Sequence, residues 1–437
     1  MIQLVKNSLV LSLIFFLCSC IGPVKEIKYQ IEDSFEDDSI PENPSSLAEI
    51  HKNYLVNILN SGSFDESSLK NLFITNIDDL IFYPSSHSVT CMNLKNSAVQ
   101  WKYNHHTDIT SGISSSNEKV FFVDYDGFLL ALNLKGSIEW KIFVGEVLSP
   151  PVFADRSVIV RSTNGTFSSF NIIDGSVNWT YKVPSSPLPI RSWGELTIFE
   201  NILYAGIGSG KVISINIADG SLIWETTYSS PKGVSEIERS NDTTSKVIVD
   251  EFALYAISSK GNIAAISKSN GEILWSRALS SFDGMVTNND SLFVTHTTGS
   301  LYKIDKNNFK VIWRNSDLQG RNVTRPFLYK HFVVVSDFDG YLHFLNLNDG
   351  KIMTRIKISD THLLKPLLTN ESNNLFYVST SGDYHLVNIN LDSKVKKDEH
   401  NDENNEIYTD KKLPINENEN ENENESGSIL DSLKFWE

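Results

Sequence analysis

The stretch LNLKGSIEW, residues 132–140, returns in degenerate form along most of the chain, at intervals of about forty residues. Each copy has an alternating apolar strand, an Asn, a short turn that ends in Gly, and a second strand that carries Trp. Clear copies end at Trp179, Trp224 and Trp275, and weaker copies begin at Met92, Ile304, Leu345 and Val387. This interval is the length of a four-stranded propeller blade, so the repeat indicates the architecture before any single residue is considered.

Eight copies predict an all-β fold, an eight-bladed β-propeller of four-stranded antiparallel blades. The copies are accompanied by tight Gly turns that suit hairpins, such as Asp126-Gly127. A seven-bladed ring with an N-terminal flap is the alternative. Ring closure usually needs a strand from one terminus, and residues 72–75 are our candidate. A weak helical pattern over residues 48–59 predicts a short helix before the ring.

The N-terminal residues have the form of a bacterial export signal. Lys6 gives a positive charge, and residues 9–17 form an apolar run too short to span a bilayer. The tetrad that ends in Cys20, Leu-Cys-Ser-Cys, resembles a lipobox, in which lipid is attached to the last Cys. Cys18 departs from the usual Ala, Ser or Thr of that motif. We therefore expect lipidation at Cys20, with an ordinary signal peptide cleaved elsewhere as the alternative.

The chain has a formal net charge of −16, concentrated at its two ends. Residues 21–50 contain two Lys against eight Asp or Glu, and residues 398–437 contain three Lys against thirteen. The region between them is nearly neutral, which argues against a nucleic-acid-binding protein. The predicted organisation is a signal peptide (1–19), a lipid-anchored tether with a possible short helix (20–62), the β-propeller (63–396) and a disordered acidic tail (397–437).

The patterns typical of catalytic and metal sites do not fit this sequence. If Cys20 is lipidated, Cys91 is the only Cys left after cleavage, which allows no disulfide framework and favours a small core residue. Adjacent His105 and His106 in a strand would point to opposite faces and could not bind one metal ion. No P-loop or nucleophile elbow occurs. We therefore predict no catalytic, cofactor-binding or metal-binding residue.

The Asn, Gly and Trp of the repeat resemble the pyrroloquinoline-quinone (PQQ)-type propeller repeat over most of residues 72–395. Two families with very different functions use it: the quinoprotein dehydrogenases and the BamB-type lipoproteins of the outer-membrane β-barrel assembly machine. The lipobox, the length and the lack of an adjacent Cys pair in the mature part favour the second. That resemblance implies a non-catalytic scaffold, anchored in the outer membrane and facing the periplasm. A PQQ-dependent dehydrogenase-like quinoprotein, or a surface adhesion or sensor propeller, is the alternative.

Two segments resemble partner-contacting segments of the BamB-type lipoproteins. Leu188, Ile190 and Arg191 match a Leu-x-Leu/Ile-Arg motif. Arg239 and Asp242 match an Arg-x-x-Asp-x-Asp run, with a Thr at the second Asp. The resemblance implies that these residues bind the periplasmic domains of the central barrel assembly protein. Unfolded outer-membrane protein clients are a further expected partner, the lipid anchor joins the protein to the membrane, and no nucleic acid is expected.

Overall fold

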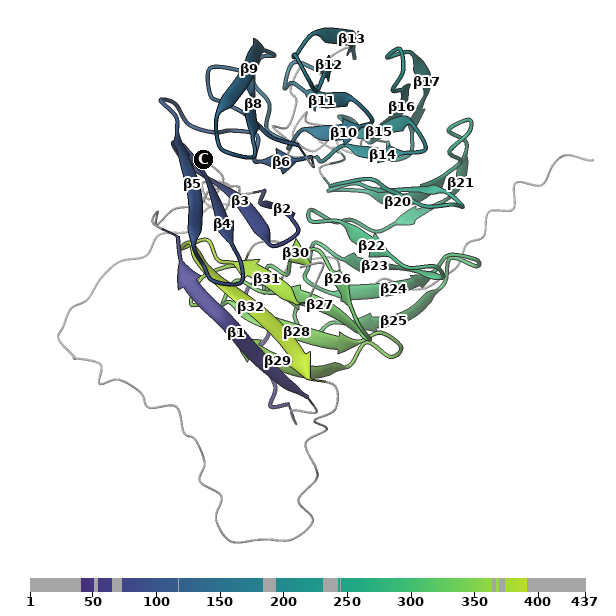
Figure 1. Cartoon of the computed structure of the whole chain (residues 1–437). Helices are drawn as coiled ribbons and strands as arrows, with labels where there is room; N and C mark the ends of the chain where they lie inside the picture. The colour runs from purple at the N-terminus through teal and green to yellow at the C-terminus, as the bar shows by residue number, and fades with distance from the viewer. Residues whose placement is uncertain are drawn as a thin grey trace, which may run out of the picture. The chain divides into compact units, whose positions relative to one another are not determined.

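The computed structural model describes residues 41–50, 54–64, 73–116, 118–183, 194–230, 243, 245–363, 367–368 and 374–390. Its regular elements in these ranges are strands, which form eight four-stranded antiparallel sheets. The sheets are the blades of one propeller ring (Figure 1). This confirms the predicted eight-bladed fold, and the seven-bladed alternative is wrong.

Blades 1 to 7 each use four consecutive strands, named A to D from the channel outward. Blade 1 consists of β2 (Thr75–Ile77), β3 (Leu80–Ser85), β4 (Ser88–Asn93) and β5 (Val99–Asn104), and blade 2 of β6 (Ser114–Ser115), β7 (Lys119–Val123), β8 (Phe128–Asn133) and β9 (Ile138–Phe143). Blade 3 consists of β10 (Val152–Ala154), β11 (Ser157–Arg161), β12 (Thr166–Asn171) and β13 (Val177–Lys182), and blade 4 of β14 (Thr197–Phe199), β15 (Ile202–Ile207), β16 (Lys211–Asn216) and β17 (Leu222–Thr227). Blade 5 consists of β18 (Ile248–Val249), β19 (Leu254–Ile257), β20 (Asn262–Ile266) and β21 (Ile273–Ala278). Blade 6 consists of β22 (Met285–Thr287), β23 (Ser291–Thr295), β24 (Leu301–Asp305) and β25 (Val311–Asn315). Blade 7 consists of β26 (Phe327–Tyr329), β27 (Phe332–Ser336), β28 (Tyr341–Asn346) and β29 (Ile352–Lys357).

Blade 8 is completed by the N-terminal strand. Its strands are β30 (Leu367–Leu368), β31 (Leu375–Val378), β32 (Asp383–Asn390) and, outermost, β1 (Leu55–Ser63). Antiparallel pairing of β1 with β32 closes the ring (Figure 1). The closing strand is therefore not at residues 72–75, because Thr75 begins the innermost strand of blade 1. The expected helix over residues 48–59 is also wrong, and the propeller begins before residue 63.

Each pair of neighbouring blades shares one buried apolar cluster built from the alternating faces of their strands. The repeat Trp extends this core toward the outer strands. In five blades its indole Nε1 donates a hydrogen bond to a backbone carbonyl in the C–D turn of the next blade, as Trp179 does to Ile217 O at 2.6 Å. The same turn places its Gly against the indole ring. The repeated sequence is thus the joint between blades.

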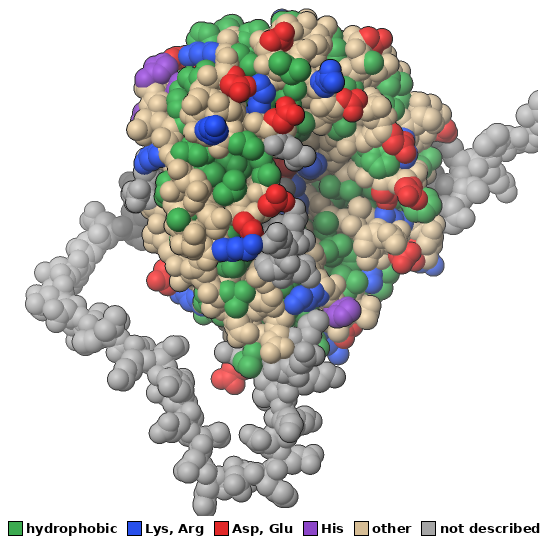
Figure 2. Space-filling model, in the orientation of Figure 1, with side chains coloured by type: hydrophobic (Ala, Val, Ile, Leu, Met, Phe, Trp, Pro, Cys, Tyr) green, Lys and Arg blue, Asp and Glu red, His purple; other side chains and the backbone are tan. Residues whose placement is uncertain are grey.

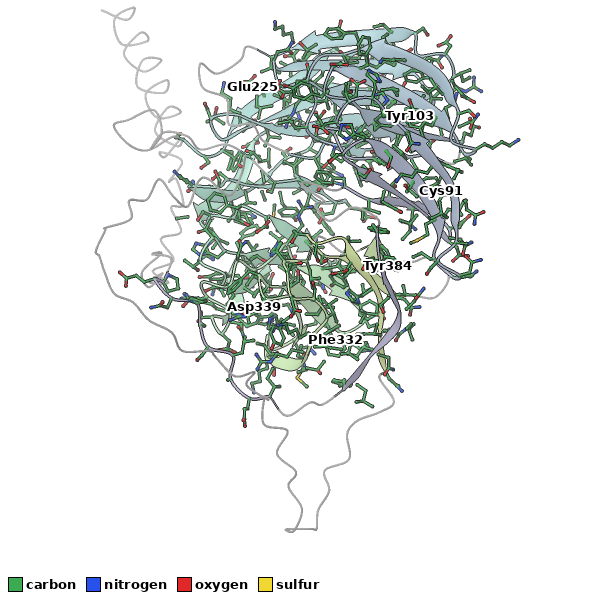
Figure 3. The ribbon with its side chains drawn as sticks, turned by 90° about the vertical axis from the view of Figure 1, so that its left-hand side faces the viewer. Cys91, Tyr103, Glu225, Phe332, Asp339 and Tyr384 are labelled. Atoms are coloured by element: carbon green, nitrogen blue, oxygen red, sulfur yellow. The ribbon has the colours of Figure 1, made fainter. Side chains whose placement is uncertain are left out.

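Cys91 is a core residue, as predicted. It lies in β4 of blade 1 (Figure 3), has no solvent exposure and packs in the cluster between blades 1 and 2. Burial raises the pKa of its thiol to about 11. The thiol is therefore protonated at neutral pH and is not a nucleophile in the folded protein.

Candidate partner-binding face

Every residue predicted for lipid attachment or partner binding lies outside the described residues: Cys20, Leu188, Ile190, Arg191, Arg239 and Asp242. Their roles stay predictions. The structure does describe the residues that flank the two predicted contact segments. Segment 184–193 connects blade 3 to blade 4, and segment 231–242 belongs to the connection from blade 4 to blade 5. Both segments therefore belong to D–A connections, one on each side of blade 4.

Antiparallel strands place all B–C turns and D–A connections at one end of the propeller, which we call the loop face. The A–B and C–D turns lie at the other end, the turn face. The two predicted contact segments are connections of the loop face. The topology shows that they border the same blade on the same face.

Arg161 holds the described end of the first segment. It is the last residue of β11 in blade 3, and its guanidinium reaches blade 4. Nη2 donates to the Gly194 carbonyl at 3.1 Å, and Nη1 donates to the Gly206 carbonyl at 2.6 Å. Hydrogen bonds from a charged guanidinium to backbone carbonyls are stronger than those from a neutral donor. Arg161 therefore fixes the position of Gly194, where the chain leaves segment 184–193.

Gly206 also receives the end of the second segment. A Cβ on Gly206 would overlap the Thr243 methyl group, so the close approach of Thr243 requires Gly at this position. Thr243 is held from the other side by Tyr228, whose hydroxyl lies 2.7 Å from Thr243 Oγ1. The described ends of both segments therefore meet at Gly206, at the loop-face end of β15.

A repeat position that the sequence analysis missed lies two residues before each strand A. In blades 4 to 7 this position alternates in charge, with Glu195, Lys246, Asp283 and Arg325 in order; blades 1 to 3 have Phe73, Gly112 and Pro150. Arg325 Nη1 lies 3.1 Å from Glu195 Oε1, although blades 5 and 6 lie between the blade of Glu195 and the blade of Arg325. This ion pair therefore crosses the mouth of the central channel on the loop face. Comparison of the repeats position by position, rather than by motif, would have found it.

The loop face also exposes aromatic side chains. Tyr125 and Phe338 lie in B–C turns, Phe143 ends a strand D, and Phe282 lies in a D–A connection. Tyr125 is the most exposed of the four, at 69%. Across the surface seen in Figure 2, acidic and basic side chains are interspersed and form no continuous field of one sign. Such a surface suits a protein partner better than a polyanion.

A second polar network ties residues 41–50 to blades 6 and 7. The Arg321 guanidinium donates to Asp337 Oδ2 at 2.7 Å and to the Ser45 carbonyl at 3.1 Å. His343 Nε2 donates to the same Asp337 oxygen at 3.0 Å. Burial alone raises the pKa of Asp337, but these donors outweigh it and leave the pKa below its ordinary value. The network fixes the N-terminal segment to the ring.

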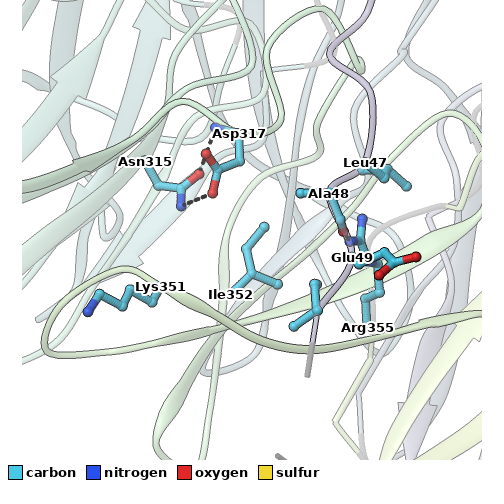
Figure 4. A pocket seen from close by; sticks show the side chains of 9 residues that line it. Leu47, Ala48, Glu49, Asn315, Asp317, Lys351, Ile352 and Arg355 are labelled. Carbon is cyan, nitrogen blue, oxygen red and sulfur yellow. Dashed lines mark hydrogen bonds between the residues drawn. The ribbon is translucent and has the colours of Figure 1, made fainter. Parts of the chain in front are cut away.

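A cavity of about 340 Å³ lies beside that segment (Figure 4). Residues 47–50 form one wall, and the others come from blades 6 and 7: Asn315, Asp317, Lys351, Ile352 and Arg355. Asn315 donates to Asp317 Oδ2 at 3.1 Å, and Arg355 donates to the Ala48 carbonyl. The lining mixes two cations, two carboxylates and aliphatic groups, so it favours no one class of ligand.

The two adjacent His residues differ from the expectation. Residues 105 and 106 follow β5 rather than continue it, and their ring centroids lie 4.4 Å apart, not on opposite faces. His105 is buried and donates from Nε2 to Asp124 Oδ2 at 3.0 Å. Burial lowers the pKa of His105, and the Asp124 bond opposes this shift without overcoming it. In the described ranges, no group of three or more His, Cys, Asp or Glu is arranged to hold a metal ion.

A search for membrane-spanning helices over the described part of the chain found none that is long and apolar enough. The lipid anchor predicted at Cys20 stays a prediction, since residues 1–40 lie outside the described ranges. The predicted acidic tail also lies outside them.

Comparison with known proteins supports one family. The sequence model of the family described as outer membrane protein assembly factor BamB matches residues 85–315. The assembly factor BamB of Shewanella oneidensis is 31% identical over 284 residues, which are 64% of this chain and 71% of the relative. That of Moranella endobia is 29% identical over 286 residues, or 65% of this chain and 73% of the relative.

Two solved structures share the fold. BamB from Moraxella catarrhalis aligns with a TM-score of 0.69 and 22% identity, covering 76% of this chain and 99% of that one. Quinohemoprotein alcohol dehydrogenase from Comamonas testosteroni aligns with a TM-score of 0.63 and 11% identity, covering 77% of this chain and 76% of that one. These likenesses show the propeller alone. The sequence match, which spans more than half of the chain, shows more: this protein belongs to the outer membrane protein assembly factor BamB family.

Proposed function

We propose that this protein is a non-catalytic scaffold lipoprotein of the machinery that assembles β-barrel proteins into the bacterial outer membrane. Membership in the BamB family carries the proposal, because the relatives bear the name of outer membrane protein assembly factor. In this proposal lipid on Cys20 anchors the protein to the outer membrane, facing the periplasm. The propeller then binds the periplasmic domains of the central barrel assembly protein, and unfolded outer-membrane proteins are further partners.

The contacts would come from the two segments that border blade 4. Leu188, Ile190 and Arg191 combine two aliphatic groups with a guanidinium, a composition typical of interface anchors. Arg239 and Asp242 add one charge of each sign, which suits steering of a partner toward one orientation. The shared support of both segments at Gly206 favours a single partner surface over two independent ones.

The likeness to a quinohemoprotein dehydrogenase does not favour a second function. At 11% identity it supports the fold alone, and one fold serves many functions. The Arg325–Glu195 ion pair crosses the channel mouth on the loop face. Since the family match carries the proposal, we propose that the protein acts by presentation and orientation rather than by chemistry.

Affinity capture from detergent-solubilised membranes tests the proposal. The tagged full-length protein should recover a large outer-membrane barrel protein, identified by mass spectrometry. A double variant, Leu188→Ala with Arg191→Glu, should lose that recovery. Phe252→Ala is the matched control, because Phe252 is 73% exposed in the A–B turn of blade 5, on the opposite face.

The outcomes separate the function from its residues. If the double variant still recovers the barrel protein, the result would support the function and exclude segment 184–193 as the contact. Failure of the wild-type protein to recover any barrel protein would contradict the proposal as a whole. Cys20→Ser tests the anchor separately, since it should move the protein from the membrane fraction to the soluble periplasmic fraction.

A further inference from the structure

The mouth of the central channel carries a charge cluster that no sequence motif marks. Glu195, Lys246, Asp283 and Arg325 each precede strand A of their blade by two residues. Their charges alternate from blade 4 to blade 7, so each carboxylate has a cation on a neighbouring blade or across the channel. The cluster is neutral as a whole, which allows charged groups to sit close together at the axis.

Glu195 is where these charges meet. Its Oε1 lies 3.1 Å from Arg325 Nη1, and its Oε2 lies 3.9 Å from Lys246 Nζ. The side chains of Glu195 and Arg325 are only 13% and 18% exposed. One carboxylate therefore connects blade 4 to blade 5 beside it and to blade 7 across the channel.

Arg325 is in turn held by blade 6. Its Nε donates to the Asp283 carbonyl at 2.7 Å. The next residue, Gly284, has a φ of +104°, and a Cβ there would lie 2.9 Å from Ser245 Cβ and 3.4 Å from Arg325 Nε. The Gly leaves room for the guanidinium to pass, so the direction in which Arg325 points is set by its surroundings.

The cluster lies at the ends of both predicted contact segments. Glu195 follows segment 184–193 after a single residue, Gly194, which Arg161 holds by its carbonyl. Lys246 follows segment 231–242 closely, after Thr243, which packs on Gly206. An ion pair between Glu195 and Lys246 therefore joins the described end of one segment to the described end of the other.

We propose that Glu195 is a positioning residue of the partner-binding face. Through Arg325 and Lys246 it fixes the spacing between the chain ends that follow segments 184–193 and 231–242, without contacting the partner itself. The proposal rests on the proposed function, because it assigns Glu195 to the same binding face. Preorganising two contact segments strengthens binding by removing the cost of ordering them in the complex.

The test combines affinity with hydrogen exchange in the full-length protein. Glu195→Gln keeps the shape of the side chain and removes its charge. We expect it to weaken binding of the purified periplasmic domains of the central barrel assembly protein about tenfold, the loss that a preorganisation effect of modest size gives. Amide exchange should quicken over both residues 194–199 and residues 243–249. The melting temperature should also fall, because Gln leaves the mostly buried Arg325 guanidinium without its carboxylate, so affinity is measured at a temperature at which both proteins are fully folded.

Two variants make the test specific. Arg325→Gln should weaken binding as Glu195→Gln does, and the double variant should cost little more than Glu195→Gln alone, because both single changes remove the Glu195–Arg325 ion pair. Glu225→Gln is the matched control, because it breaks the Lys211–Glu225 ion pair of 2.6 Å on the outer strands of the same blade. It should leave both affinity and exchange unchanged.

Each result decides the inference. Wild-type affinity in Glu195→Gln, or faster exchange at only one of the two chain ends, would overturn it. If the wild-type protein does not bind the periplasmic domains, the proposed function fails and the affinity part of this inference fails with it. The exchange data then decide alone whether Glu195 fixes the two ends.

Discussion

Replacing Gly220 with Ala tests whether the contact between Gly and Trp holds neighbouring blades together. Gly220 ends the C–D turn of blade 4 with a φ of +75°, in the left-handed region. A Cβ there would lie 2.6 Å from the Cδ2 and Cε3 atoms of Trp179, the repeat Trp of blade 3. Trp179 Nε1 also donates to the Ile217 carbonyl of the same turn at 2.6 Å. Alanine would therefore strain its own backbone and displace the indole.

The two costs have different sizes. A positive φ costs an L-residue about 1–2 kcal/mol, and the stiffer unfolded chain returns about 0.4–1 kcal/mol, which leaves about 1 kcal/mol. Displacing the indole adds a lost hydrogen bond, about 1 kcal/mol, and part of the packing energy, which for complete removal of a Trp reaches about 3–5 kcal/mol. We expect Gly220→Ala to lower the free energy of unfolding by about 3 kcal/mol.

A matched control isolates the second cost. Gly145 has a φ of +80°, but the nearest atom to its added Cβ would be Ser162 Cβ, 3.9 Å away. Gly145→Ala should therefore cost about 1 kcal/mol, the backbone part alone. In a Trp179→Ala background, which lacks the indole, Gly220→Ala should also cost only about 1 kcal/mol.

Urea unfolding followed by circular dichroism measures these differences, since indole fluorescence would change with the Trp itself. Equal losses for Gly220→Ala and Gly145→Ala would refute the reasoning. So would a loss from Gly220→Ala that is the same with and without Trp179, because the contact would then contribute nothing to stability.

Three single side chains give further predictions. Because burial raises the Cys91 pKa to about 11, the thiol should not react with a thiol reagent at pH 8 until the protein is unfolded in urea. Asp337→Asn removes the buried carboxylate that accepts from Arg321 and His343, leaves the buried Arg321 guanidinium with the partly exposed Asp339 carboxylate, and should cost about 3 kcal/mol in urea unfolding. Since the native pKa of Asp337 lies below its unfolded value, this contribution should be complete above about pH 4 and decline as the pH falls below it; a constant difference down to pH 3 would contradict the assignment. Phe309 occupies the turn position of Gly with a φ of +61°, so Phe309→Gly should be about 1 kcal/mol more stable than Phe309→Ala, the reverse of their usual order; equal thermal stabilities would show that the positive φ carries no cost.

The blade repeat could be predicted because the residues that define it have one structural role each. Trp packs between blades and donates to the next turn, and Gly supplies a positive φ beneath it. Turn chemistry and strand alternation then agree with the same period, so local and global signals coincide. Even the degenerate copy with Phe309 in place of Gly keeps the contact, with ring centroids of Trp275 and Phe309 4.6 Å apart.

The closing strand could not be predicted because its sequence has no clear period of two. In β1, only Val56, Asn60 and Gly62 are partly buried, and the register shifts between Ile58 and Asn60. The apolar residues Ile50, Tyr54, Ile58 and Leu59 give a helical pattern instead. The strand forms because β32 offers an unpaired edge, a tertiary requirement that local sequence does not record.

The candidate site also has features that the sequence could predict and features that it could not. The contact segments were predicted from a resemblance, and the topology added that both border blade 4 on the loop face. The support beneath them could not be predicted, because Glu195 and Arg325 lie 130 positions apart and neither belongs to the motif that defines the repeat. Arg161 and Gly206 likewise act through backbone carbonyls and close approach, which depend on the folded blades.

The position two residues before strand A separates what the fold needs from what this protein adds to it. Across the described blades it accepts Phe, Gly, Pro, Glu, Lys, Asp and Arg, so the propeller does not require one residue type there. The Trp and Gly of the repeat vary far less, because five of the contacts between neighbouring blades use both of them. Alternating charges on four consecutive blades therefore need a reason outside the blade itself. The role that we propose for Glu195 would supply one, since a cluster that spans the channel can set the spacing between the described chain ends at Gly194 and Thr243 where a single blade cannot.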